Sequence, residues 1–263
     1  MISVKSKAEI MAMRRAGGVV ARVLQILAES VKPGITTSEL NDIAERELKI
    51  CGARSSFKGY RGFPANICVS INDEIVHGIP GKRIINDGDI VSLDFGAIVE
   101  GFHGDSALTV PVGEISPQAK NLIQTTREAL DAGIATARAG ARLGDISSSI
   151  QRYSETRGFN VVREYTGHGI GKAMHEEPLV PNFGRPGEGP ELKAGMTLAL
   201  EPMLTVGDWH TKVGNDRWVV STIDGSFAAH FEHTIAITDD KAEILTLSPF
   251  ECHANSSITP AAG

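Results

Sequence analysis

The sequence predicts an α+β fold made of two pseudo-symmetric halves, in which a curved antiparallel sheet carries helices on its outer face. Three observations lead to this prediction. The chain contains an internal duplication, and each copy runs in the order helix, helix, strands. The strand-like runs are joined by hairpins and not by helical crossovers, which is typical of antiparallel sheets.

A long helix is predicted at the start of each half, at roughly 7–31 and 117–139. Apolar residues recur there at steps of three and four, as at Val20, Leu24 and Leu27. This is the period of a helix that buries one face. We therefore expect both segments to pack on the outer face of the sheet.

The duplication is clearest at the second helix of each half. Gly34 and Gly52 bracket this segment in the first half, and Gly140 and Gly158 bracket it in the second. Both spacings are 18 residues (52 − 34 and 158 − 140). Glycines that close an amphipathic run are typical C-caps, because they adopt the left-handed conformation without strain.

Each half then supplies an apolar strand that ends in an acid. Asp94 lies six residues after Gly88 (94 − 88), and Glu201 lies six residues after Gly195 (201 − 195). The two acids are therefore repeat equivalents. A His-x-x-Pro sequence precedes each strand, at His77–Pro80 and His175–Pro178.

No linker rich in Pro or Ser separates the halves. We expect residues 1–248 to form one domain, with halves at about 5–112 and 113–248. The segment 249–263 is mostly small and polar, and it is expected to be a disordered tail.

Composition narrows the class of protein. The net charge of −6 argues against sequence-independent binding of DNA, which needs clustered Lys and Arg. The N-terminal region has no apolar h-region, and no segment approaches the roughly 20 apolar residues that cross a bilayer, so we expect a cytoplasmic protein with no membrane partner. We also expect a monomer. The three cysteines, Cys51, Cys68 and Cys252, have no C-x-x-C spacing, so we expect reduced thiols.

The segment from Asp94 to Asp105 predicts a hairpin that turns at Glu100-Gly101. Such a turn pairs Asp94 with Ala107 and places Asp105 on the same face, diagonal to Asp94. The two carboxylates would repel each other unless a cation lies between them. Taken alone, such a pair is more often a solvated surface feature.

The second half repeats the arrangement, which favours a buried site. Glu201 ends the apolar run 196–200, and Glu232 lies in the next strand-like run, 230–237. Four carboxylates in one sheet interior repel one another and lose hydration. Two divalent cations would neutralise their four charges.

An imidazole for this site is expected from Gly167-His168-Gly169, where glycines give a permissive backbone and open access. A lone His is more often structural. A phosphate loop is a poor alternative, because the spacing of these glycines and the Ala173 after Lys172 both break the G-x-x-x-x-G-K-[ST] pattern.

Four carboxylates and one imidazole suit Mn, Fe, Co or Zn in the divalent state. Two such ions about 3.5–4 Å apart are the usual machinery of metal-assisted amide hydrolysis. Phosphoryl transfer is less favoured, because no phosphate-binding loop accompanies the acids.

Six short motifs occur along the chain: His77-Gly-Ile-Pro, Asp94 with Gly-Phe-His-Gly-Asp105, Gly167-His-Gly-Ile-Gly, His175-Glu-Glu-Pro, Leu200-Glu-Pro-Met and Phe231-Glu-His-Thr. Through these motifs the sequence resembles the type I methionine aminopeptidases of the pita-bread fold, over about residues 3–248. The absence of a Cys/His-rich N-terminal extension and of a long insertion before Glu232 resembles the short bacterial form.

The resemblance implies removal of the initiator Met from nascent polypeptides, with the ribosome as a candidate contact, when the second residue is small. It implies Asp105 and Glu232 as bridging ligands and Glu201 as both ligand and base. His77 and His175 would contact the substrate, and His175 would stabilise the oxyanion. The implied metal ligands are Asp94, Asp105, His168, Glu201 and Glu232.

The resemblance also implies a pocket for the Met side chain. Phe57 and Met174 depart from residues common in the family, and both are expected at the pocket mouth. His230 shares a strand face with Glu232, as a partner of that ligand or as an exposed residue. The substrate-binding residues implied are His77, Tyr60, Phe63, Cys68, Trp218 and His175.

Two alternatives stay open at this point. One is an Xaa-Pro peptidase such as prolidase, although such proteins usually carry an extra N-terminal domain. The other is a pita-bread binding protein without catalysis, which would be expected to lack some of the five ligands.

Overall fold

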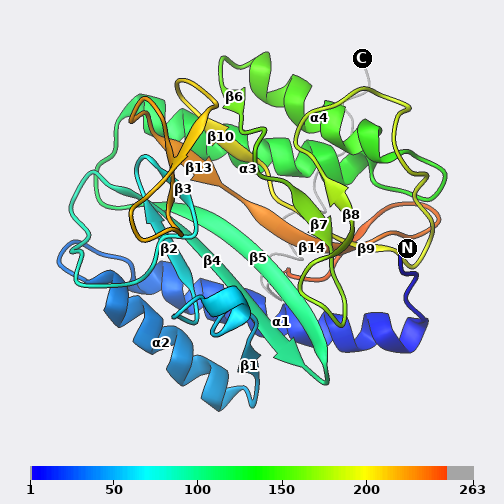
Figure 1. Cartoon of the computed structure of the whole chain (residues 1–263), viewed down its shortest axis with the longest axis horizontal. Helices are drawn as coiled ribbons and strands as arrows, with labels where there is room; N and C mark the ends of the chain where they lie inside the picture. Colours follow the sequence, from blue (N-terminus) through cyan, green and yellow to red (C-terminus); the bar gives the residue numbers. More distant parts are fainter. Residues whose placement is uncertain (1, 248–263) are drawn as a thin grey trace, which may run out of the picture.

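The computed structural model describes residues 2–247; the predicted tail at 249–263 lies outside the described residues. It shows an α+β fold in which helices from both halves flank one large antiparallel sheet (Figure 1). The helices are α1 (Lys7–Ser30), α2 (Thr37–Ile50), α3 (Pro117–Thr136) and α4 (Leu143–Glu155), with a 3-10 turn at Tyr60–Gly62.

The strands of the first half are β1 (Arg54–Ser55), β2 (Cys68–Ile71), β3 (Glu74–Val76), β4 (Ile90–Val99) and β5 (Phe102–Pro111). Those of the second half are β6 (Asn160–Val161), β7 (Gly167–Gly169), β8 (Glu176–Val180), β9 (Thr197–Leu200), β10 (Met203–Thr205), β11 (Thr211–Val213), β12 (Val220–Thr222), β13 (Ala228–His230), β14 (Glu232–Ala236) and β15 (Glu243–Ile244).

The large sheet has nine strands and runs through both halves. Its main path is β1-β4-β5-β14-β9-β7-β8, while β2 pairs with β4 and β15 pairs with β14. Within this sheet the two halves meet where β5 pairs with β14. Two smaller sheets, β13-β10-β6 and β11-β12-β3, complete the fold.

The predicted helices are present, and their ends follow from capping. Ser6 and Thr36 each cap a helix and form a reciprocal capping box with Glu9 and Glu39. In the second half α3 ends at Thr136, three residues earlier than expected, because Ala137 already has an extended conformation.

The duplication extends to backbone conformation. The three pairs of glycines that mark the repeat all have left-handed φ angles, between 63° and 94°. Glycine adopts this conformation without the penalty of a Cβ atom. The glycine pairs are Gly34 with Gly140, Gly52 with Gly158, and Gly88 with Gly195.

The helices cover one face of the sheet and leave the other for the polar residues. Along β4, Val91, Leu93 and Phe95 belong to the apolar core formed with α1 and α2, whereas the alternate residue Asp94 points the opposite way. A second core packs α3 and α4 against β9 and its neighbours. Within residues 2–247, no helix is long and apolar enough to cross a membrane.

Candidate metal centre and substrate pocket

The site is built around Ala107 in the middle of the sheet. Ala107 pairs with Asp94 of β4 on one side and with Glu232 of β14 on the other. Directly paired residues project from the same face of a sheet. The seam between the halves therefore brings an acid from each half to one row, with only a methyl group between them.

The hairpin has the register that the sequence predicts. Val99 pairs with Phe102, and both turn residues, Glu100 and Gly101, have positive φ angles (51° and 81°). Positive φ at both central residues is the mark of a type I′ turn, whose twist matches that of the strands. The predicted pairing of Asp94 with Ala107 is confirmed.

Asp105 lies in the next row of the same face, opposite Gly96. Its backbone is fixed from the other half by Thr234. The Asp105 N–H donates to Thr234 Oγ1 at 3.0 Å, and Thr234 Oγ1 donates to the Asp105 carbonyl at 2.7 Å. Sequence reasoning missed Thr234, since nothing local marks a contact between residues so distant in the chain.

Glu201 and His168 complete the group from β9 and β7. Glu201 directly follows β9, and His168 pairs with Ala199 of the same strand. His168 Nε2 lies 3.6 Å from Glu201 Oε1. The structure thus brings all five predicted ligand residues to one face of the sheet.

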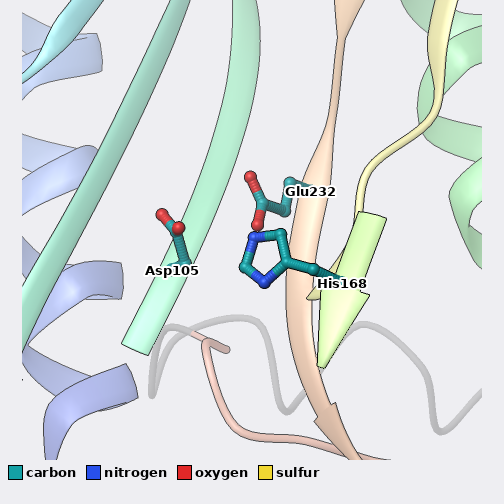
Figure 2. A group of neighbouring side chains, drawn as sticks. All are labelled: Asp105, His168 and Glu232. Carbon is teal, nitrogen blue, oxygen red and sulfur yellow. The ribbon is translucent and has the colours of Figure 1, made fainter. Parts of the chain in front are cut away.

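Figure 2 shows Asp105, His168 and Glu232 projecting from three different strands toward a common space. One possible ligand atom of each lies within 4.8 Å of the others. All three residues are buried, each at most 3% exposed. Glu201 keeps a small exposed edge, with 14% of its side chain accessible.

The glycines beside His168 have a different role from the one expected. A Cβ at Gly167 would lie 2.3 Å from the Ala199 carbonyl oxygen, and one at Gly169 would lie 2.2 Å from that of Glu177. The glycines let β7 lie tightly between β8 and β9. The expectation that these glycines leave His168 openly accessible is therefore wrong. The ring is buried, and the glycines serve the close packing of the strands.

Burial raises the pKa of every carboxyl in the group. It raises the pKa of Asp94 to about 7 and, together with the charge of Asp94, the pKa of Asp105 well above its usual range. The pKa values of Glu201 and Glu232 are raised in the same way by burial and then by the neighbouring acids.

Several oxygens of these acids have no hydrogen-bond partner within residues 2–247: Asp94 Oδ1, Asp105 Oδ1 and Glu232 Oε1. Buried polar atoms are normally paired, because an unpaired one loses hydration without compensation. His168 is neutral, since burial lowers its pKa to about 4. Unpaired carboxylate oxygens and a neutral imidazole fit a divalent cation well.

Histidines also line the site beyond the acids. The His175 ring stacks between His168 and Tyr60, with centroids 4.0 Å and 5.3 Å away. The pKa of His175 is lowered to about 3, mainly by burial and to a smaller extent by the nearby His168 and Arg61. His77 has a positive φ of 64° and an edge-on contact with Trp218.

A cavity of about 130 Å³ opens beside the acids. This is close to the roughly 150 Å³ that admits a benzene-sized molecule, so it suits one apolar side chain. Phe63 meets Trp218 edge-on at 5.1 Å in its wall. Its lining includes the five predicted ligands and all six predicted substrate-binding residues: His77, Tyr60, Phe63, Cys68, Trp218 and His175.

Three further residues refine this picture. Phe57 and Met174 lie in the buried wall of the cavity, 4% and 9% exposed, and not at an open mouth. Arg61 also lines the cavity and has a left-handed φ of 49°. Sequence reasoning missed Arg61, because an Arg in a glycine-rich turn looks like a solvated surface residue.

His230 is buried, with 1% exposure, so the alternative of an exposed ring is wrong. Its Nε2 lies 3.8 Å from Glu232 Oε2, beyond hydrogen-bond distance. The pKa of His230 is lowered to about 3, mainly by burial and to a smaller extent by the nearby His77, so this ring is neutral.

Comparison with known proteins agrees with this geometry. The chain is 53% identical over 248 residues to a methionine aminopeptidase of Clostridium acetobutylicum, covering 94% of this chain and 99% of that protein. It is 52% identical over 246 residues to methionine aminopeptidase 1 of Bacillus subtilis, again covering 94% and 99%. The crystal structure of methionine aminopeptidase from Thermotoga maritima superposes with a TM-score of 0.93 at 46% identity, covering 94% of this chain and 100% of that one.

Residues 11–239 match metallopeptidase family M24. This match spans most of the chain and contains all five acids and imidazoles of the buried group. The chain therefore belongs to metallopeptidase family M24 and, within it, to the methionine aminopeptidases.

Proposed function

We propose that the protein removes the initiator Met from nascent polypeptides whose second residue is small, using two divalent ions. Asp94, Asp105, His168, Glu201 and Glu232 would hold the ions, with Asp105 and Glu232 bridging them. Co, Mn, Fe and Zn all suit this oxygen-rich set with one imidazole. The substrates would be the N-termini of new chains in the cytoplasm, with the ribosome as their source.

One observation carries the proposal. Two acids from each half meet on one face of the sheet, with several oxygens unpaired, and this group forms one side of a cavity whose other side is apolar. Isolated charges in such a place would be strongly unfavourable. A metal centre beside a pocket for one apolar side chain accounts for both features.

When bound, the two ions would supply Lewis acidity toward the scissile carbonyl and activate the attacking water. Glu201 stands at the edge of the group with part of its side chain accessible. It is thus placed to accept the proton of the water and to deliver it to the leaving amine. This role suits a carboxyl whose pKa burial has raised.

His175 would donate a hydrogen bond to the oxyanion. Its ring is neutral, so it supplies an N–H without adding a positive charge to the cation site. Stacking against Tyr60 and His168 holds the ring in place, and a preorganised donor is what stabilises charge that develops during the reaction. His77, which lines the same cavity beside Trp218, would contact the peptide.

The pocket accounts for the choice of Met. Phe63, Cys68 and Trp218 form an apolar wall with Phe57 and Met174, which suits a flexible thioether side chain.

We also infer that the halves, at about 5–112 and 113–248, act as one catalytic domain. The pairing of β5 with β14 makes the sheet continuous between them. Each half supplies part of the ligand set, so neither half would hold the centre alone.

The assay compares the peptides Met-Ala-Ser, Met-Leu-Ser and Ala-Pro-Ser, with and without a chelator. We expect release of Met from Met-Ala-Ser, slow cleavage of Met-Leu-Ser, and loss of both activities when the metal is removed. Activity that survives the chelator would overturn the proposal. Preference for Ala-Pro-Ser would instead identify an Xaa-Pro peptidase, and binding of Met-Ala-Ser without turnover would identify a binding protein.

A further inference from the structure

His230 is a fully buried imidazole with two unsatisfied nitrogens. Neither Nδ1 nor Nε2 has a hydrogen-bond partner within residues 2–247. A neutral imidazole offers one N–H donor and one acceptor, and leaving both unpaired in the protein interior is unfavourable. Such a ring needs an explanation beyond packing.

Two hydrogen bonds hold the backbone of His230 in place. The His230 N–H donates to Thr109 Oγ1 at 2.9 Å, and Thr109 Oγ1 donates back to the His230 carbonyl at 2.9 Å. His230 ends β13 and Glu232 begins β14, so a single residue separates them in the chain. The nearest carboxylate oxygen to the ring is Glu232 Oε2, 3.8 Å from Nε2.

The first half contains a counterpart for comparison. His103 lies two residues before Asp105, as His230 lies two residues before Glu232 (105 − 103 and 232 − 230). The His103 ring has a partner, because its Nδ1 lies 2.9 Å from Ser56 Oγ. Of these two rings, only His230 has both nitrogens free to act on the neighbouring acid.

We propose that His230 is a positioning residue: when the metal binds, the 3.8 Å between its Nε2 and Glu232 Oε2 shortens to hydrogen-bond distance, and Nε2–H donates to this oxygen and fixes the orientation of the carboxylate. The inference rests on the proposed function, in which Glu232 is a bridging ligand. Each carboxylate oxygen has two lone pairs, so Oε2 can accept from the ring and still bind an ion, while Oε1, which has no hydrogen-bond partner within residues 2–247, remains available to the group that Glu232 forms with Asp105 and His168. Loss of a group that orients a metal ligand typically lowers metal affinity by about 10- to 100-fold.

The test measures metal binding directly. The metal-free protein is titrated with Co(II), and affinity and the visible absorption spectrum of the bound ion are followed for wild type, His230→Gln, His230→Asn and His230→Leu. The Gln amide nitrogen reaches the position of Nε2, whereas the Asn amide nitrogen reaches only that of Nδ1. We expect Gln to bind within about threefold of wild type, and Asn and Leu to bind about 10- to 100-fold more weakly with an altered spectrum.

His233→Leu serves as the matched control. His233 directly follows Glu232, but its ring lies on the opposite face, where Nδ1 contacts Thr246 Oγ1 at 2.9 Å. We expect this variant to lower the melting temperature and to leave Co(II) affinity and spectrum unchanged. A general weakening of β14 would instead lower affinity in the control as well and would overturn the proposal.

The remaining outcomes also test the proposed hydrogen bond. Wild-type affinity in His230→Leu, or an equal loss in Gln and Leu, would overturn the proposed hydrogen bond. If the Leu variant does not fold, the contrast between Gln and Asn settles the question alone. Failure of the wild-type protein to bind Co(II) would overturn the metal centre itself, which is a separate result.

Discussion

Cys68 and Asp94 are direct cross-strand partners on β2 and β4. Cys68 in the wall of the cavity and Asp94 in the carboxylate group therefore lie side by side in the sheet. A Met side chain that contacts the Cys68 sulfur would lie one strand away from the proposed metal ligands. In the proposed function, this relationship would tie the size of the side chain to the position of the bond that is cleaved.

The first prediction concerns thiol reactivity. Burial, followed by the charges of Asp94 and its neighbours, raises the pKa of the Cys68 thiol well above its usual range, whereas Cys51 is only half-buried. Since the thiolate is the reactive form, iodoacetamide should modify Cys51 in the folded protein at least about tenfold faster than Cys68. Peptide mapping by mass spectrometry measures both rates, and denaturant should abolish the difference. Equal rates before denaturation would contradict the placement of Cys68.

The second prediction concerns the two hydrogen bonds that join Thr234 of the second half to Asp105 of the first. Thr234→Val keeps the shape of the side chain but removes both hydrogen bonds to the Asp105 backbone. The free energy of unfolding should fall by about 1–3 kcal/mol, because a buried N–H and a carbonyl lose their partner. Co(II) affinity should fall as well, since Asp105 is no longer fixed.

Thr126→Val is the control for this substitution. Thr126 is equally buried, but its hydroxyl donates only to the Leu122 carbonyl within α3. Urea unfolding should detect a smaller loss, and Co(II) titration should detect no change. If both variants bind Co(II) alike, the bond to Asp105 does not support the centre.

The third prediction concerns the segment that carries His175. Lys5 is 8% exposed, and its Nζ lies 2.6 Å from Glu176 Oε2, next to His175 in the chain. Lys5→Met leaves this carboxylate without its cation, so kcat for Met-Ala-Ser should fall by about 3- to 10-fold while KM changes little. The matched control is Arg14→Met, which breaks an exposed pair with Glu243 at 2.7 Å and should leave kcat unchanged. Equal kinetics in the two variants would exclude a role for Lys5.

The fourth prediction concerns stability and pH after metal removal. Burial raises the pKa of Asp94 to about 7 from 3.8. A raised carboxyl pKa means that the folded state binds the proton more tightly than the unfolded state does. The protonated group therefore contributes to the free energy of unfolding at low pH, and this contribution is lost as the pH rises through about 7. The chelated protein should therefore melt at a lower temperature at pH 8 than at pH 6.

Bound Mn(II) or Co(II) should remove most of this pH dependence, because the ions replace the protons as partners of the acids. Differential scanning calorimetry with and without chelator measures the effect. Asp94→Asn should flatten the slope of the chelated protein. An unchanged slope in this variant would show that other groups cause it.

The sequence alone predicted the parts of the site that follow from local rules. The hairpin register came from Glu100-Gly101, because a two-residue turn sets every pair that follows it. The equivalence of Asp94 and Glu201 came from the repeat. The fold class followed from the same repeat, and the observed helix limits differ by only a few residues.

The features of the site that could not be predicted from the sequence depend on contacts between distant segments. The bond from Thr234 to Asp105 joins residues 129 positions apart, and no local pattern marks it. Nor could the burial of His230 be predicted, because a polar ring beside an acid suits a surface strand equally well. The role of Gly167 and Gly169 was misjudged for the same reason, since only the packing of β7 between β8 and β9 reveals it.

The pairing of β5 with β14 also determines when the active site can form during synthesis of the chain. Ala107 pairs with Glu232, which leaves the ribosome 125 residues later (232 − 107). Until then a first half that folds early would carry an open strand edge and two carboxylates with no opposing ligands. A growing chain of this protein would thus gain its metal centre only after Glu232 has left the ribosome, and a chain that stops before this residue would be both inactive and exposed to aggregation along that edge.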